Sequence, residues 1–242
     1  MPFAETDGLQ VFQFSNLSSI PWLGYGISTS SLNVAIEEKR KFFFKTLGIR
    51  ERNVVEAEQV HANHVAVVGE KEGGHLILAT DGMITNIPGV ALLIKIADCV
   101  PILLADPKNK VVGIIHAGWK GTVQEIARLT VNHMEDHFGT DPKNIVAGIG
   151  PSIGPCCYEV DTPVIEAFDR FPYKNKIFSR QKENKAHLNL WLANKFQLID
   201  TGIKEENIEI SKLCTFDNPE LFFSERREKP TGRFGALIWI KE

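Results

Sequence analysis

The chain lacks a long apolar run and an excess of basic residues, and each absence excludes a class of protein. Its longest apolar stretch, Val90–Ile96, contains Lys95 and is far too short to cross a bilayer. The 242 residues carry a formal net charge of −3, so no basic surface for nucleic acid is expected. The first residues, MPFAETDGLQ, have neither the basic nor the apolar region of a signal peptide. We therefore expect a cytoplasmic protein with no membrane or nucleic-acid partner.

Cysteine is also scarce, with four residues in the whole chain: Cys99, Cys156, Cys157 and Cys214. In a reducing compartment such cysteines are expected to be thiols rather than disulfides. The neighbours Cys156 and Cys157 could bridge each other only through a strained ring, which again disfavours a structural disulfide. Cys214 lies in a β-rich segment and is most simply a core residue.

Internal repeats, low-complexity segments and Gly/Ser linkers are absent, which predicts a single domain over residues 1–242. The apolar pattern has helical spacing in four segments, namely Ser31–Gly48, Gly118–Gly139, Thr162–Phe171 and Leu190–Ile199. Short β-rich runs predict strands at 9–14, 54–60, 64–68, 75–80, 90–96, 102–105, 111–116, 145–149, 208–212 and 233–240. Clusters of strands with few helices favour a layered α/β fold with mixed sheets.

Three short segments each offer one side chain that can bind a metal or take part in nucleophilic catalysis. His61 lies in QVHANH, Cys99 follows an apolar strand in ADCVP, and His116 opens HAGWKG at a strand end. Three protein ligands with an open fourth position are the catalytic arrangement for zinc. The same side chains also suit a cysteine nucleophile with a histidine base. The spacing alone leaves both alternatives open.

A second group of candidate residues is cationic. The segment SERREKPTGR (224–233) contains several arginines ahead of a predicted strand. It is either a phosphate-binding segment or a solvated loop. The glycine-rich run GIGPSIGP (148–155) lacks the nucleotide-binding fingerprints, and it either presents N–H groups to an anion or forms a rigid turn. His133 and His137 stand four residues apart on the long predicted helix, outside the HExxH order, and we expect them on a solvated face.

In chain order, the motifs QVH, TDGMITNIPG, ADCVPILLADP, HAGWKGT, IGPSIGPCCYEV, CT…FFSxRR and TGR closely resemble the YfiH/YlmD family. That family is also described as laccase-domain, polyphenol-oxidase-like or purine nucleoside phosphorylase, and the resemblance covers residues 55–240. It implies an α/β/β/α arrangement of mixed sheets, similar to cytotoxic-necrotising-factor-type cysteine hydrolases. It also implies a zinc ion held by His61, Cys99 and His116.

The sequence departs from the family pattern in its cationic residues. An Arg-Gly-Gly-Val-Ser segment usual near the N-terminus is replaced by GYGISTSSLN (24–33), which contains no arginine. Lys120 stands where arginine is common, and Glu225 stands where the family tends to have histidine or tyrosine. The remaining candidate residues for phosphate binding, with Arg227 as the first choice, are Arg226, Arg227, Arg233 and Lys120.

The activity implied by the resemblance is phosphorolysis of adenosine, inosine or methylthioadenosine to a free base and ribose 1-phosphate, with adenosine deamination as a further activity. Its partners would be a purine nucleoside and phosphate, while the oligomeric state is not fixed. The first alternative is an amidase of the peptidoglycan-editing type, in which Cys99 is the nucleophile and His116 its base. Copper oxidation of phenols is disfavoured, because coupled copper sites need paired histidine motifs and the seven histidines here are mostly scattered. The last alternative is a non-enzymatic module with a fully protein-ligated zinc.

Overall fold

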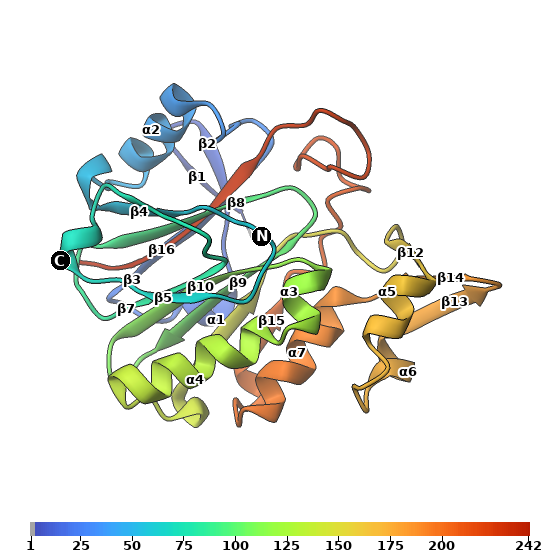
Figure 1. Ribbon diagram of the computed structural model, residues 1–242. Helices are drawn as coiled ribbons and strands as arrows, with labels where there is room; N and C mark the ends of the chain where they lie inside the picture. The colour runs from blue at the N-terminus through green and yellow to red at the C-terminus, as the bar shows by residue number, and fades with distance from the viewer. Residues whose placement is uncertain (1–2) are drawn as a thin grey trace.

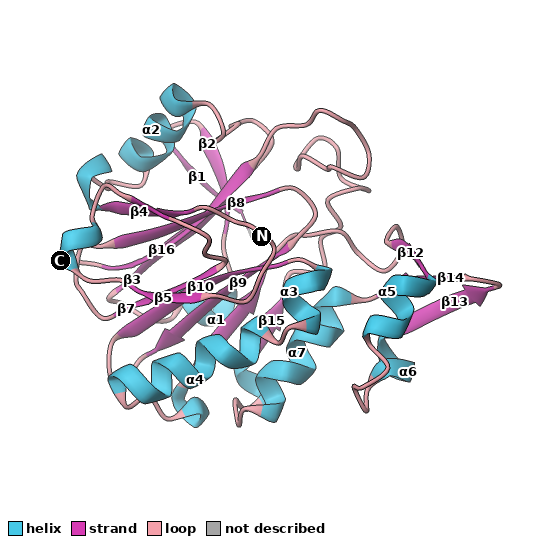
Figure 2. Cartoon of the chain, viewed as in Figure 1, coloured by secondary structure: helices cyan, strands magenta, loops and turns pink. Residues whose placement is uncertain are grey.

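The computed structural model describes residues 3–242 and is built around two large β-sheets (Figures 1 and 2). The seven-stranded sheet has the order β1-β2-β3-β16-β8-β4-β6. Its strands are β1 (Phe3–Thr6), β2 (Leu9–Phe12), β3 (Leu23–Ser28), β16 (Phe234–Ile240), β8 (Ala91–Ile96), β4 (Val54–Ala57) and β6 (Leu76–Ile77). Its pairs are antiparallel except where β4 meets β8 and β6, so the sheet is mixed.

The six-stranded sheet is mixed as well, with the order β15-β11-β9-β10-β7-β5. Its strands are β15 (Ile208–Ile210), β11 (Val146–Ile149), β9 (Val100–Asp106), β10 (Val111–Ala117), β7 (Gly82–Thr85) and β5 (Val65–Val67). The outer pairs, β15 with β11 and β5 with β7, are parallel, and the inner pairs are antiparallel. A small third sheet projects at the right of Figure 1 and contains β12 (Glu159–Asp161), β14 (Lys185–Leu188) and β13 (Phe178–Lys182).

Short helices connect and cover the sheets. The α-helices are α1 (Ser15–Ser18), α2 (Glu37–Thr46), α3 (Trp119–Val123), α4 (Ile126–Phe138), α5 (Thr162–Ala167), α6 (Lys174–Ile177) and α7 (Leu190–Asp200). Single 3₁₀ turns occupy Glu51–Asn53, Glu70–Glu72, Pro142–Asn144 and Glu205–Asn207. Within residues 3–242, no helix combines the length and the apolarity needed to span a bilayer.

The buried side chains define the order of the layers. On β8, Leu92 points into the core between the two sheets, whereas its neighbour Leu93 packs with Phe43 of α2 on the outer face. This alternation is the period-2 pattern of a strand buried on both faces. On the other side, Met134 of α4 packs in the cluster that contains Ile115 of β10. Helices therefore cover both outer faces of the paired sheets, and the predicted mixed α/β architecture is confirmed (Figure 2).

Three predicted helices differ from the observed ones, and the one expected over Thr162–Phe171 already ends at Ala167. The helix expected over Gly118–Gly139 is interrupted at Glu125, which has a left-handed φ of 60° and separates α3 from α4. The Glu125 carboxylate accepts a hydrogen bond from Arg128 Nε at 2.8 Å, so side-chain contacts hold the break. The helix expected from Ser31 begins at Glu37, because the Asn33 side chain instead accepts the backbone N–H of Arg233 at 3.0 Å.

Candidate active site

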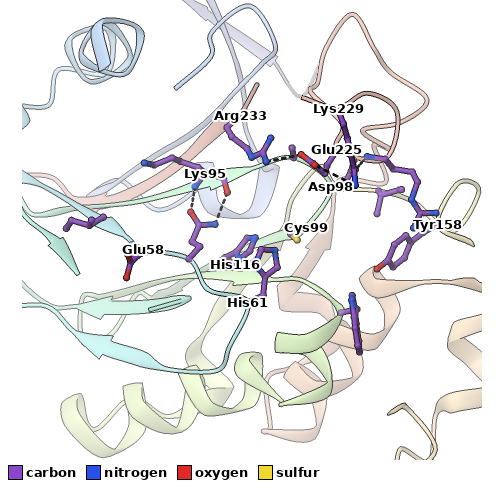
Figure 3. Close-up of a pocket in the computed structure, with 17 residues that line it drawn as sticks. Glu58, His61, Lys95, Asp98, Cys99, His116, Tyr158, Glu225, Lys229 and Arg233 are labelled. Carbon is purple, nitrogen blue, oxygen red and sulfur yellow. Dashed lines mark hydrogen bonds and ion pairs between the residues drawn. The ribbon is translucent and has the colours of Figure 1, made fainter. Parts of the chain in front are cut away.

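His61, Cys99 and His116 come together at one end of the central strands of the six-stranded sheet (Figure 3). Strand β10 lies beside β9, and His116 pairs with Pro101, so Cys99, which immediately precedes β9, reaches the same end of the two strands. His61 comes from the loop that leaves β4 in one sheet and enters β5 in the other. One potential ligand atom from each residue lies within 4.8 Å of the other two. The geometry is that of a group able to hold one metal ion.

A buried carboxylate, Asp81, organises two of these three residues. One of its oxygens lies 2.8 Å from His116 Nδ1, and the pair is closed off from solvent. The carboxylate also accepts the backbone N–H groups of Val60, His61 and Ala62 at 2.9–3.1 Å. His61 has a φ of 60°, a conformation that costs roughly 1–3 kcal/mol in a residue other than glycine. The Asp81 hydrogen bonds hold this strained loop in place and leave His116 Nε2 to face Cys99.

The group shifts the pKa of its own members in opposite directions. Burial raises the pKa of the Cys99 thiol, but the charge of His116 and hydrogen bonds from both histidines outweigh it and lower the pKa to about 6. Burial lowers the pKa of His116, but the Cys99 charge and the hydrogen bond to Asp81 raise it to about 9. Without a metal, the group is therefore a thiolate beside an imidazolium at neutral pH.

The three residues lie in a cleft of about 780 Å³ that also contains several charged and aromatic side chains. Cationic groups reach the cleft from β8, which carries Lys95, and from the segment before β16, which carries Arg226, Lys229 and Arg233. Aromatic surface comes from Trp119 and Tyr158, and the Arg226 guanidinium lies 5.2 Å from the centre of the Tyr158 ring. A donor group for a metal thus shares one cavity with a cationic wall of Lys95, Arg226, Lys229 and Arg233, and the carboxylates of Glu58, Asp98 and Glu225 line that cavity as well (Figure 3).

Two of the four predicted phosphate-binding residues line the cleft, and the other two do not. Arg226 and Arg233 line the cleft, but Arg233 is bonded to Glu225 at 2.9 Å. Arg226 donates one hydrogen bond to protein within residues 3–242 through its side chain, to the Glu159 carbonyl at 2.8 Å. Its other guanidinium N–H groups are therefore available to a bound anion.

Arg227 and Lys120 lie outside the cleft lining. The Arg227 guanidinium donates to the backbone carbonyls of Thr215, Phe216 and Phe222 at 2.7–3.1 Å, so it braces a loop. Lys120 is exposed and lies over the Trp119 ring at 5.8 Å. The first choice made from the sequence, Arg227, therefore points away from the cavity, whereas its neighbour Arg226 faces it.

Asp98 ties the cleft to two segments that are distant in the sequence. Its carboxylate accepts hydrogen bonds from Thr215 Oγ1 at 2.5 Å, Ser224 Oγ at 3.1 Å and the Arg226 N–H at 2.7 Å. Its backbone carbonyl accepts the N–H of Ile153. Asp98 also has a left-handed φ of 81°, immediately before Cys99. These contacts fix the position of the Cys99 thiol and of Arg226 together.

The glycine-rich loop 148–155 is a rigid turn. The N–H groups of Gly150, Ser152 and Ile153 donate to carbonyl oxygens of the protein, and Gly154 N–H donates to Cys214 Sγ at 3.2 Å. These donors are used internally, so the interpretation of this loop as an anion cradle is wrong for these four residues.

Sequence reasoning missed several residues of the cleft, although the sequence contained a signal for some of them. Asp81 lies inside the TDGMITNIPG motif as an acidic residue between a β-rich run and a strand. Lys95 is the single charge in the apolar stretch Val90–Ile96. Tyr158 follows the cysteine pair in CCYEV. No local pattern indicated the partners of Asp98, because they lie more than a hundred residues further along the chain.

Comparisons with known proteins agree with this fold and site. Residues 18–241 match the family described as multi-copper polyphenol oxidoreductase laccase. The chain is 36% identical over 229 residues to purine nucleoside phosphorylase YlmD of Bacillus subtilis (strain 168), covering 91% of this chain and 82% of that protein. It is 34% identical over 190 residues to adenosine deaminase RL5 from an unknown prokaryotic organism, with coverage of 75% and 72%.

A solved structure gives the same assignment. The crystal structure of Bacillus licheniformis hypothetical protein YfiH matches this chain with a TM-score of 0.91 at 32% identity, covering 99% of both chains. Together, the family match, the sequence relatives and this shared fold show that the chain belongs to the laccase-like YfiH/YlmD family.

Proposed function

We propose that the protein is a zinc-dependent purine nucleoside phosphorylase. One observation carries this proposal: a single cleft holds a His–Cys–His donor group and a wall of cationic side chains. Phosphorolysis requires both a site for the nucleoside and a site for a phosphate anion. The names of the relatives, purine nucleoside phosphorylase and adenosine deaminase, support a purine nucleoside as the substrate.

The residues of the site fit a zinc ion held by His61, Cys99 and His116. Two imidazoles and one thiolate are common zinc ligands, and a three-ligand set leaves one position open. Gly118 supports this fit, because a Cβ there would lie 3.0 Å from Cys99 Sγ and 3.2 Å from His61 Cδ2. When bound, zinc supplies a Lewis acid that polarises water or a substrate atom. Copper is the alternative ion for the same donors.

The protein's own residues then orient and neutralise the substrates. In phosphorolysis, a phosphate oxygen forms the new bond to the sugar C1′ while the bond to the base breaks and the base takes a proton. Arg226 holds the phosphate with its available N–H groups. Lys95 and Lys229 also reach the cleft, but they are ion-paired with Glu56 and Glu225 and contribute less positive charge to it. Trp119 offers a flat apolar surface to the purine. Asp81 keeps the His116 ring in its orientation throughout.

The experiment is an assay of the zinc-loaded protein with adenosine, inosine and methylthioadenosine, each with and without phosphate. We expect base release only with phosphate, together with one ribose 1-phosphate for each base. Conversion of adenosine to inosine without phosphate would identify the accompanying deaminase activity. No base release from any of the three nucleosides would disprove the proposed phosphorylase.

A second candidate function is favoured by the charge state of the metal-free group. Cys99, His116 and Asp81 form a thiolate, an imidazolium and an orienting carboxylate, the arrangement of a cysteine amidase. Such an enzyme would act on amide-linked muramyl precursors and would keep its activity after the metal is removed with a chelator. The phosphorylase would lose its activity under the same treatment and regain it with zinc.

A further inference from the structure

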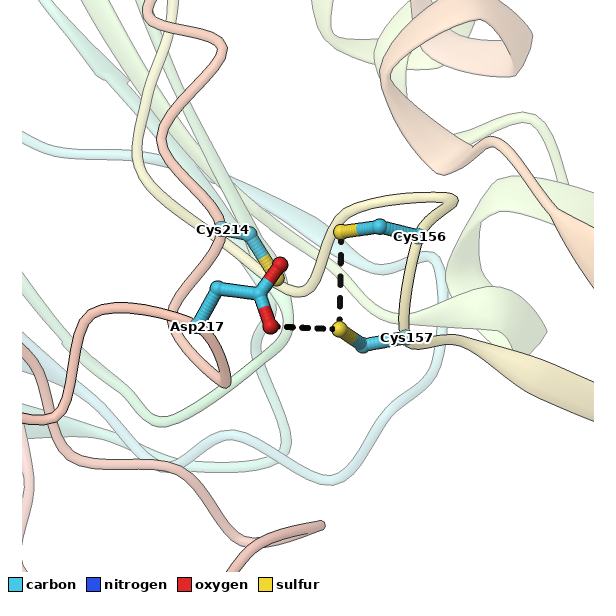
Figure 4. A group of neighbouring side chains, drawn as sticks. All are labelled: Cys156, Cys157, Cys214 and Asp217. Carbon is cyan, nitrogen blue, oxygen red and sulfur yellow. Dashed lines mark hydrogen bonds between the residues drawn. The ribbon is translucent and has the colours of Figure 1, made fainter.

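A second group of potential metal ligands lies outside the residues that line the cleft (Figure 4). It consists of Cys156, Cys157, Cys214 and Asp217, which we call the cysteine cluster. One atom from each of these four side chains lies within 4.8 Å of the other three. Among residues 3–242, this cluster and the triad of His61, Cys99 and His116 are the two groups with such an arrangement. The proposed reaction uses none of the four side chains.

We propose that the cysteine cluster is a structural zinc site that joins the loop 150–158 to the segment 213–217. Three thiolates and one carboxylate complete a four-coordinate shell, which is the closed arrangement of a structural zinc. Zinc with Zn–S bonds of about 2.3 Å places neighbouring tetrahedral sulfurs about 3.8 Å apart. Cys156 Sγ and Cys157 Sγ are 3.4 Å apart, and Cys157 Sγ lies 3.0 Å from an oxygen of Asp217. Small side-chain rotations would therefore close the shell.

The surroundings of the cluster match those of a metal–thiolate site. The N–H of Gly154 donates to Cys214 Sγ at 3.2 Å, which is the contact that stabilises a metal-bound sulfur. A Cβ on Gly154 would lie 3.1 Å from both Cys156 Sγ and Cys214 Cβ, so glycine leaves room for the sulfurs. The Arg227 guanidinium binds the carbonyls of Thr215 and Phe216, and its charge offsets the negative charge of a zinc with four anionic ligands.

The proposed site has a clear structural task. Ser152 and Cys214 form an isolated parallel bridge, so the two segments already meet through their backbones. Thr215, next to Cys214, donates to Asp98, while Tyr158, next to Cys157, lines the cleft. Binding would follow the balance Zn²⁺ + 3 RSH → Zn(SR)₃⁻ + 3 H⁺, with the Asp217 carboxylate as the fourth ligand. The ion would fix both walls of the cleft without entering it.

The test is a zinc titration of reduced, chelator-stripped protein against a competing chromophoric chelator. We expect two equivalents for the wild type and one for Cys99→Ser, which keeps the cluster. The double variant Cys156→Ser/Cys157→Ser should also bind one equivalent, held by the triad. Substituting Co²⁺ counts thiolates in each site, since the charge-transfer absorption of three thiolates should survive in Cys99→Ser and disappear in the double variant.

A matched pair of acidic residues makes the test sharper. Asp217→Asn removes one proposed ligand and should weaken the binding of the second zinc by at least about tenfold. Loss of a residue that only hydrogen-bonds to a ligand already has an effect of that size. Glu220→Gln, which changes an exposed residue shortly after that segment, should leave both affinities unchanged. Circular dichroism of every variant checks that it is folded, and the wild-type cobalt spectrum tests the proposal without any substitution.

Two results would overturn the proposal. One is a wild type that binds a single equivalent of zinc, all of which is lost in Cys99→Ser. The other is a purified protein whose mass shows a disulfide at Cys214, and whose reduced form takes up no second zinc. Both results come from metal content and protein mass and need no activity assay, so they can be distinguished from a failure of the proposed phosphorylase activity.

Discussion

The molecule contains two groups of potential metal ligands, and the thiols of the two groups have neighbours of opposite charge. Beside Cys99 lie imidazoles, and the pKa of its thiol falls to about 6 although burial opposes this. Beside Cys156 lies the carboxylate of Asp217, and burial together with that carboxylate raises the pKa to about 11. The comparison teaches that the neighbouring charges decide whether a cysteine is reactive at neutral pH.

The two groups also differ in the number of ligands that they offer. The triad of His61, Cys99 and His116 has three donors and faces a cleft, whereas the cysteine cluster has four, which would complete a closed shell around the proposed zinc. An open position allows a substrate to approach the metal, and a closed shell excludes it. Substitutions in the triad should therefore mainly lower activity, whereas substitutions in the cysteine cluster should mainly lower stability.

The largest expected effect separates activity from stability. Cys99→Ser should lower kcat/KM for phosphorolysis by at least about a thousandfold, because loss of the metal removes several kcal/mol of transition-state stabilisation. Cys214→Ser should instead lower the melting temperature and keep most of the activity at low temperature. Steady-state kinetics and thermal unfolding of both variants measure the split. Equal loss of activity in the two variants would remove the distinction, provided that Cys214→Ser still holds zinc in the triad.

The second test replaces one carboxylate in each of the two regions by a neutral amide. Asp81→Asn should lower activity by up to about a hundredfold through the misplaced His116 ring. It should also cost about 3 kcal/mol of unfolding free energy, because it disrupts a buried charged network that holds the His61 loop. Asp217→Asn should leave kcat unchanged. Denaturant unfolding at neutral pH gives the stability, and an Asp81→Asn variant with wild-type kinetics would refute its positioning role.

The same Asp81 network predicts how stability depends on pH. Burial raises the pKa of Asp81, but hydrogen bonds from His116 and the loop N–H groups lower it below its ordinary value. A lowered pKa stabilises the fold above the unfolded-state value and loses that contribution as pH falls through the folded-state value. The acid limb of the stability curve should therefore flatten in Asp81→Asn, which unfolding titrations below pH 5 or so would measure.

A third comparison uses two adjacent arginines. Arg226→Ala should raise the phosphate KM by roughly thirtyfold, equivalent to about 2 kcal/mol for one charge-assisted contact. Arg227→Ala should leave the phosphate KM near the wild-type value and lower the melting temperature, since Arg227 braces backbone carbonyls. Kinetics at varied phosphate distinguish the two variants. The reverse pattern would return the phosphate role to Arg227.

The smallest expected effect concerns the rates of alkylation of the metal-free protein. At pH 7, iodoacetamide should modify Cys99 at least about tenfold faster than Cys156, because the larger thiolate fraction outweighs the lower nucleophilicity of the more acidic thiol. The Cys99 rate should level off above pH 6 or so, whereas the Cys156 rate should keep rising. Peptide mass spectrometry at several pH values measures both rates. Zinc should protect Cys99 from the reagent.

Local patterns in the sequence were sufficient to predict most of the fold. The apolar runs of β8, β9 and β10 and the spacing of α4 and α7 gave elements that the structure contains. They failed at Glu125, because contacts with Arg128 in the next turn and with the distant Arg170 hold a break that no spacing reveals. They also failed for the short strands β1, β7 and β12, for β3, which is buried along its whole length, and for the hairpin of β13 and β14.

The candidate site was predictable only in part. Residue type and position at strand ends identified His61, Cys99 and His116, which the fold brings together. Side-chain direction was not accessible, so alternation along 224–233 pointed to Arg227 rather than Arg226. The cysteine cluster could not be predicted either, since Cys214 meets Cys156 only through the pairing of two irregular segments. The implied likeness to cytotoxic-necrotising-factor-type hydrolases stays a prediction.

Strand β16 has a consequence for the order in which a growing chain can assemble. It lies in the middle of the seven-stranded sheet, between β3 and β8, although it is made after both. Until residues 234–240 leave the ribosome, the facing edges of β3 and β8 therefore lack their partner strand. Such unpaired edges can form hydrogen bonds with the wrong strand. The segment with Arg226 and Arg233 arrives just before that strand. Insertion of β16 into its slot is thus the late step that both closes the sheet and completes the cationic wall of the cleft.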